Sequence, residues 1–152
     1  MKRLIFSAVL LFAAPAFADL PGVDLLANLL VKQFDRDHDS MIDLTEWQNG
    51  ANDGFVELDH DRDGSISESE IDALVDPLSE DFGKLGATAC VALIKKILFT
   101  FDANGDRSVS KGEYEQGCTA LFKLLDANHD GWITRIELAE LPAKLLARSD
   151  KK

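Results

Sequence analysis

One twelve-residue pattern constrains the fold of this chain more than any other feature. In its second copy, from Asp59 to Glu70, aspartates occupy positions 1, 3 and 5, glycine position 6, isoleucine position 8 and glutamate position 12. Alternate residues of a tight turn can direct their oxygens to one point, and glycine supplies the positive φ that the reversal needs. The pattern therefore predicts a turn that gathers oxygen ligands around a hard cation.

Three further copies run over residues 35–46, 102–113 and 126–137, and we number the four loops 1 to 4 in chain order. Every copy has an oxygen-bearing side chain at positions 1, 3 and 5, an aliphatic residue at position 8 and glutamate at position 12. The alternative is four acidic surface turns without a metal. The recurrence resembles the EF-hand family over about residues 24–148, with helices leading into and out of calcium loops.

The resemblance implies up to four Ca²⁺ ions, each held by side chains at positions 1, 3, 5 and 12 and by the backbone carbonyl at position 7. The predicted ligands are Asp35, Asp37, Asp39, Met41 and Glu46; Asp59, Asp61, Asp63, Ser65 and Glu70; Asp102, Asn104, Asp106, Ser108 and Glu113; and Asp126, Asn128, Asp130, Trp132 and Glu137. The position-9 residues are predicted to support the sites indirectly, as Ser67 would through a bridging water. These residues are Asp43, Ser67, Ser110 and Thr134.

The spacing between loops predicts an all-α, EF-hand fold of helix–loop–helix repeats with very short β-pairs between loops. Only twelve residues separate Glu46 from Asp59, and apolar residues recur there at helical spacing. One helix is therefore predicted to leave loop 1 and enter loop 2, although Gly50 and Gly54 leave a break in it open. Loops at opposite ends of one helix cannot pair with each other, so each is predicted to pair with a loop from the other half.

The second half repeats the first at an offset of 67 residues, which indicates an internal duplication. We expect a signal peptide over residues 1–18, a first EF-hand half over 19–83 and a second over 84–152. Asp76 and Pro77 are predicted to end the helix after loop 2, and residues 79–86 to form a linker.

The N-terminal residues predict export. Lys2 and Arg3 precede the apolar run Leu4–Phe12, and Ala16-Phe17-Ala18 has the form of a cleavage site. We expect cleavage after Ala18 and a soluble periplasmic or secreted protein, with an uncleaved anchor as the alternative. In such a compartment Cys90 and Cys118 are predicted to form a disulfide, with two buried free thiols as the alternative.

Charge and motifs narrow the function classes. The net charge of −11 argues against binding nucleic acid or an anionic membrane surface. No arrangement of nucleophile and base and no phosphate loop predicts an enzyme. The sequence favours calcium buffering or a calcium-stabilised structural role. The alternative is a sensor that binds one specific exported partner through an apolar face, although only Met41 remains after cleavage to adapt such a face.

The loops also carry expectations about single residues. Glycine occupies position 6 in loops 2 and 4, whereas Ser40 and Arg107 replace it in loops 1 and 3. Together with the number of carboxylates, this predicts that loop 2 binds most tightly and loop 3 most weakly. We expect the side chains of the three histidines to be solvated and the ring of Trp132 to pack against a neighbour; the histidines are His38, His60 and His129.

Overall fold

The computed structural model describes residues 31–139, so the predicted signal peptide and its cleavage site lie outside the described residues. A helical segment over 31–34 leads into loop 1. The elements that follow are β1 (Ile42–Asp43), α3 (Leu44–Leu58), β2 (Ser65–Ser67), α4 (Glu68–Asp72), α5 (Val75–Leu98), β3 (Ser108–Ser110), α6 (Lys111–Leu125), β4 (Trp132–Ile133) and α7 (Arg135–Ala139). The described chain is thus mostly helical with very short strands. None of its described helices combines the length and apolar character that a membrane span requires.

Helix α3 is the predicted connection between loops 1 and 2, and it runs unbroken through Gly50 and Gly54. A methyl group at Gly50 would lie 2.2 Å from the ring of Phe34, the residue that precedes loop 1. The same relation holds in α6, where a methyl group at Gly117 would lie 2.2 Å from the ring of Phe101. Close packing against an aromatic ring therefore explains these two helical glycines.

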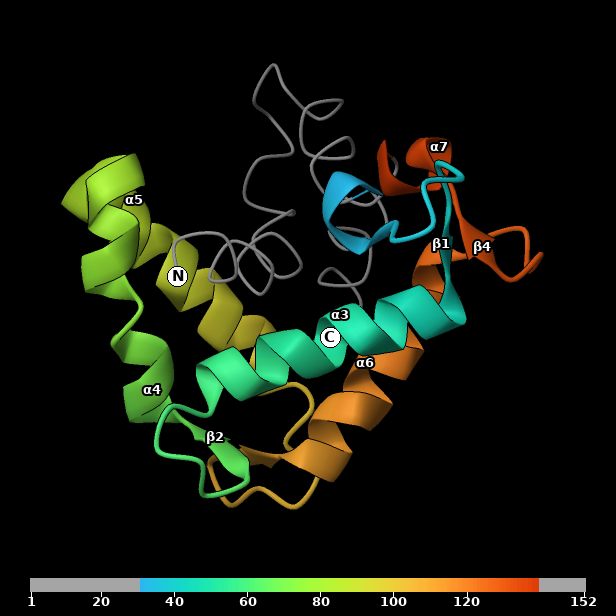
Figure 1. The fold of residues 1–152 in the computed structure, drawn as a ribbon. Coiled ribbons are helices and arrows are strands. Elements are labelled where there is room, and N and C mark those ends of the chain that lie inside the picture. Colours follow the sequence, from blue (N-terminus) through green and yellow to red (C-terminus); the bar gives the residue numbers. More distant parts are fainter. Residues whose placement is uncertain (1–30, 140–152) are drawn as a thin grey trace, which may run out of the picture.

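Helices α3 and α6 pack against each other at the centre of the molecule (Figure 1). The indole Nε1 of Trp47 donates a buried hydrogen bond of 2.8 Å to the carbonyl oxygen of Cys118. The rings of Trp47 and Phe122 meet edge to face with centroids 6.1 Å apart, and those of Phe55 and Tyr114 do so at 5.3 Å. At an offset of 67 residues, Trp47 corresponds to Tyr114 and Phe55 corresponds to Phe122, so one ring pair is the counterpart of the other. The two halves therefore share one core.

The strands pair across the two halves, as predicted. Ile42 of β1 faces Ile133 of β4, and Ile66 of β2 faces Val109 of β3, both in antiparallel register. These four side chains are fully buried. Loops 1 and 4 therefore meet at one end of α3 and loops 2 and 3 at the other, which we call the 1/4 end and the 2/3 end (Figure 1).

The connection between the halves differs from the prediction. Helix α4 already ends at Asp72, and Pro77 lies in the first turn of α5, where a missing N–H group costs no helical hydrogen bond. Residues 79–86 are helical rather than a linker, apart from Gly83 with φ 68° and ψ 161°. The predicted division into halves at residues 83 and 84 stays a prediction.

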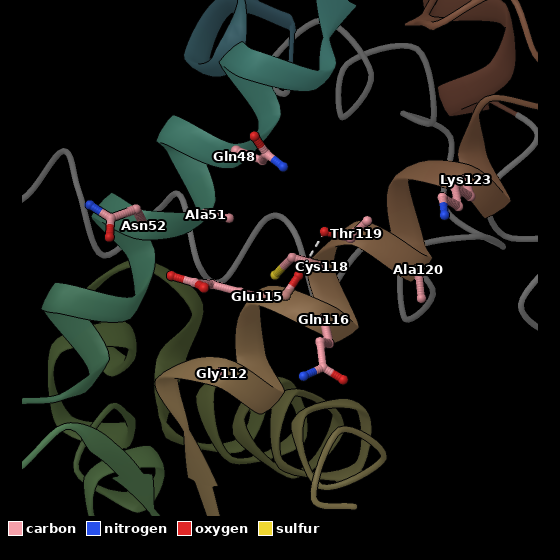
Figure 2. Close-up of a pocket in the computed structure, with 10 residues that line it drawn as sticks. All are labelled: Gln48, Ala51, Asn52, Gly112, Glu115, Gln116, Cys118, Thr119, Ala120 and Lys123. Carbon is pink, nitrogen blue, oxygen red and sulfur yellow. Dashed lines mark hydrogen bonds between the residues drawn. The ribbon is translucent and has the colours of Figure 1, made fainter.

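The predicted disulfide is wrong in this structure, because Cys90 and Cys118 are both buried free thiols. The prediction assumed that the helices on either side of loop 3 face each other through these positions. Instead, the face of α6 that carries Cys118 packs on α3, and its sulfur lies toward Ala51 (Figure 2). Burial raises the pKa of Cys118 to about 12 and also raises that of Cys90, so both remain protonated at neutral pH.

Candidate calcium sites

The four loops share one backbone frame. In loop 2, the amide of Gly64 donates to Asp59 Oδ2 over 3.1 Å, that of Asp63 to Asp61 Oδ1 over 3.1 Å, and that of Ser65 to Asp63 Oδ1 over 2.8 Å. The amides at positions 5, 6 and 7 of the other loops make the same bonds to positions 3, 1 and 5. Because these bonds fix the acidic side chains from within, each loop presents a preformed set of oxygens.

Loop 2 gathers three carboxylates around one point. One oxygen from each of Asp59, Asp61 and Asp63 lies within 4.8 Å of the other two. Oδ1 of Asp59 is buried and has no hydrogen-bond partner in the described structure. A buried carboxylate oxygen without a partner is costly, and a bound cation would compensate it. The residues of this loop therefore fit the calcium ion that the resemblance implies.

Loop 1 has a matching cluster, formed by Asp35, Asp37 and Asp39 within the same 4.8 Å limit. Loops 3 and 4 differ because asparagine occupies position 3. Asn104 Nδ2 donates to Asp106 Oδ2 over 2.9 Å, and the same amide–carboxylate contact in loop 4 measures 2.8 Å. Among the described residues, three-carboxylate clusters occur only in loops 1 and 2, so loops 3 and 4 bring less negative charge to an ion.

The glutamate at position 12 folds back over each loop. In loop 2, Oε1 of Glu70 accepts the amides of His60 (2.7 Å) and Asp61 (3.3 Å), and Oε2 accepts the amide and hydroxyl of Ser67, both at 2.8 Å. Burial acts to raise the pKa of Glu70, but these hydrogen bonds outweigh it and hold the pKa below its usual value. The carboxyl is therefore ionised at neutral pH, which is the form that binds a cation.

The residues at position 9 contact the position-12 glutamates. Asp43, Ser67 and Ser110 are the N-caps of α3, α4 and α6, and each accepts a hydrogen bond from the amide of the position-12 glutamate. Thr134 makes the same contact with Glu137. The glutamate in turn binds the position-9 amide, which forms a capping box. This signal was readable in the sequence as Asp, Ser or Thr three residues before Glu, and it places each glutamate at its loop.

Two positions of every loop have positive φ. A positive φ was expected at position 6. The structure also has a positive φ at position 4, which was not predicted from the sequence. The φ values at position 6 are 73° for Ser40, 89° for Gly64, 67° for Arg107 and 90° for Gly131; at position 4 they are 66° for His38, 62° for Arg62, 76° for Gly105 and 60° for His129. Loop 3 thus has its glycine at position 4 instead of 6. By the number of non-glycine residues with positive φ, loop 1 differs from the other loops, because it has two such residues. The missing glycine at position 6 is therefore no longer a reason to expect the weakest binding from loop 3.

The single-residue expectations have mixed outcomes. The three histidines are exposed, as predicted, and none of them belongs to the carboxylate clusters found among the described residues. Trp132 is 44% exposed, so its side chain lies outside the core; that its ring packs against a neighbour stays a prediction. The cause is the alternation of a strand: Ile133 points into the core, which turns Trp132 outward opposite Asp43. Only the backbone of Trp132 is needed at position 7.

A cavity of about 630 Å³ lies between α3 and α6 (Figure 2). Gln48 and Asn52 line it from α3, and Gln116, Thr119 and Lys123 from α6. None of the predicted calcium ligands lines this cavity. Ala51, Cys118 and Ala120 add apolar surface, so the lining is mixed.

Comparisons with known proteins agree with this geometry. The sequence model of the EF hand family matches residues 52–75 and 120–142, which contain loops 2 and 4. These are the two loops with glycine at position 6. A search of curated proteins gives no match. Each matched loop pairs with an unmatched one across the halves, so each end contains one recognised loop. With its matched segments, paired loops and carboxylate clusters, the chain belongs to the EF-hand family, for which calcium binding is the characteristic function.

Proposed function

We propose that the protein binds up to four Ca²⁺ ions, one in each loop, and that it serves as an exported calcium buffer or calcium-stabilised structural protein. The observation that carries the proposal is the convergence of Asp59, Asp61 and Asp63 around the buried, unpartnered Oδ1 of Asp59. The common backbone frame supports extending the assignment from loop 2 to the other loops.

The ion would supply the positive charge that this chain lacks. Its net charge is −11, and many of its acids are collected in the loops. Side chains at positions 1, 3, 5 and 12, with the carbonyl at position 7, would hold the ion, and the capping boxes would hold the glutamates. Without calcium, repulsion within each cluster opposes the compact state. Glutamate at position 12 favours Ca²⁺ over Mg²⁺, because it can offer both oxygens to the larger ion.

Export is part of the proposal. Removal of residues 1–18 after Ala18 would release a soluble protein into the periplasm or beyond. Calcium is often abundant outside the cytoplasm, and extracellular modules of this type bind it at about 10⁻⁴–10⁻³ M. A protein that is mostly loaded suits such a compartment.

Calorimetric titration of the mature protein with calcium tests the function, with far-UV circular dichroism and an apolar dye recorded in parallel. We expect binding by up to four sites, a gain of helicity and no new dye binding. Glu70→Gln removes one ligand charge and should weaken one site about tenfold, which corresponds to about 1.4 kcal/mol.

Glu68→Gln is the matched control, because it removes the same charge from position 10 of the same loop without touching a predicted ligand. Unchanged stoichiometry and affinity in Glu70→Gln would contradict the assignment of loop 2. A large rise in dye fluorescence at constant helicity would instead favour a sensor.

A further inference from the structure

Each central helix joins two candidate calcium sites through its own ends. Glu46, the position-12 residue of loop 1, lies in the first turn of α3. Asp59, the first ligand of loop 2, is the C-cap of the same helix, and its amide donates to the carbonyl of Phe55 over 2.8 Å. Helix α6 repeats this arrangement with Glu113 and Asp126. At 15 residues, α3 extends about 22 Å without a flexible segment.

The packing of α3 on α6 adds connections beside the loops. Trp47, which follows Glu46 directly, contacts the ring of Phe122, four residues before Asp126. Phe55, four residues before Asp59, contacts Tyr114 in the pseudo-equivalent way. Each ring contact thus lies at one end of the molecule. Trp47 and Phe122 connect loops 1 and 4, and Phe55 and Tyr114 connect loops 2 and 3. The continuous helices α3 and α6 join these two ends.

We propose that the four calcium sites form one coupled unit, in which an ion bound at the 1/4 end raises the affinity of the 2/3 end through α3 and α6. This inference rests on the proposed function. Without calcium, the terminal turns of α3 are the parts of the helix most prone to open. An ion at loop 1 fixes Glu46 and the first turn. The remaining helix is then partly ordered, so an ion at loop 2 orders less chain when it fixes Asp59.

Amide chemical shifts measure the two ends of α3 separately. The amides of Ser40 and Gly64 each donate to the position-1 carboxylate of their own loop, so they report on loop 1 and loop 2. We disable loop 1 with Glu46→Gln, and independently with Asp37→Asn at an exposed position in case the first variant folds poorly. The calcium concentration at half-saturation of Gly64 should rise about fivefold or more. Because coupling is reciprocal, Glu70→Gln should shift the half-saturation of Ser40 by a similar factor.

A matched pair of variants tests whether α3 is the route. Gln48 and Asn52 are exposed on α3 and lie outside the predicted ligand set. Replacing both with glycine softens the helix by about 1 kcal/mol per residue relative to replacing both with alanine. The coupling factor should fall in the glycine pair and persist in the alanine pair. Equal coupling factors in the two pairs would overturn α3 as the route.

The outcomes separate the coupling from the function. If Glu46→Gln or Asp37→Asn abolishes the response of Ser40 and leaves the half-saturation of Gly64 unchanged, the ends are independent and the coupling is refuted, while calcium binding stands. If neither Ser40 nor Gly64 responds to calcium in the unmodified protein, the proposed function itself fails.

Discussion

The two ends of the molecule use the same helices but store different amounts of backbone strain. At the 1/4 end, three non-glycine residues have positive φ: His38, Ser40 and His129. At the 2/3 end there are two, Arg62 and Arg107. Such a conformation costs roughly 1–2 kcal/mol per residue. The 2/3 end also has three facing residue pairs in its ladder against two, with an added bond from the amide of Lys111 to the carbonyl of Gly64.

An ionic contact separates the ends further. Lys95 of α5 reaches Asp72 over 2.6 Å and Glu68 over 3.0 Å, which ties α5 to α4 beside loop 2. At an offset of 67, the two acidic positions become Arg135 and Ala139, so the 1/4 end has no counterpart of these acids. The two halves therefore share one frame, but the contacts make the 2/3 end the better supported one. We expect the 1/4 end to depend more on calcium for its order.

The largest effect should come from filling the space beside the helical glycines, one at each end. Gly50→Ala and Gly117→Ala place a methyl group against Phe34 and Phe101, and we expect each to lower the free energy of unfolding by about 1–3 kcal/mol. Gly112→Ala meets no atom within 4 Å and should raise it by about 0.5–1 kcal/mol. Urea unfolding measures all three. Stabilisation by Gly50→Ala or Gly117→Ala would show that the rings yield easily, and unequal losses would mark the more tightly packed end.

A smaller effect is expected from relieving strain at position 6. Ser40→Gly and Arg107→Gly should each stabilise the calcium-free protein by about 1 kcal/mol, because glycine adopts positive φ without a steric penalty. If the ends differ as argued, His38→Gly should add to Ser40→Gly, since loop 1 has strain at both positions. Thermal unfolding in a chelator gives these values. A loss of stability in both position-6 variants would disprove strain as the difference between the ends.

The smallest effect should come from Lys95→Met, which removes the contact between α5 and α4. Partly exposed ion pairs contribute about 0–1 kcal/mol, so global stability should change little. Hydrogen exchange should nevertheless become faster in α4 and remain unchanged in α7. Lys111→Met breaks only the long 3.9 Å pair with Glu115 and serves as the control. Equally faster hydrogen exchange in α4 and α7 would show that this ionic contact does not distinguish the two ends.

The sequence predicted the features that follow from ligand spacing. The short interval between Glu46 and Asp59 forces a shared helix, and a shared helix separates its two loops, so pairing across the halves could be deduced. Conformations that depend on tertiary contacts could not be deduced from the sequence. Position 4 of the loops carries no consistent residue type, so its positive φ left no pattern. Gly50 looked like a helix break because the ring of Phe34 beside it is invisible in a linear reading.

Other predictions failed where the sequence allowed two environments. Pro77 marks a helix boundary, but the same residue is compatible with the end of one helix and with the first turn of the next. Cys118 belongs to an apolar stripe whose partner was taken to be the neighbouring helix in the chain. In the structure this stripe of α6 packs instead against α3, a helix far away in sequence. The orientation of Trp132 likewise depends on which residue of β4 faces the core.

The pairing of β1 with β4 has a consequence for how the polypeptide reaches its native state. Ile42 and Ile133 lie near opposite ends of the described chain, so the ladder at the 1/4 end cannot form until almost the whole polypeptide has been synthesised. The first half alone has neither of its strand partners, and its Trp47 and Phe55 lack the rings of the second half. Contacts of such long sequence separation slow folding, because a large loop must close before any stabilisation is gained. We therefore expect this chain to fold in a late, concerted event rather than by the sequential completion of two small units.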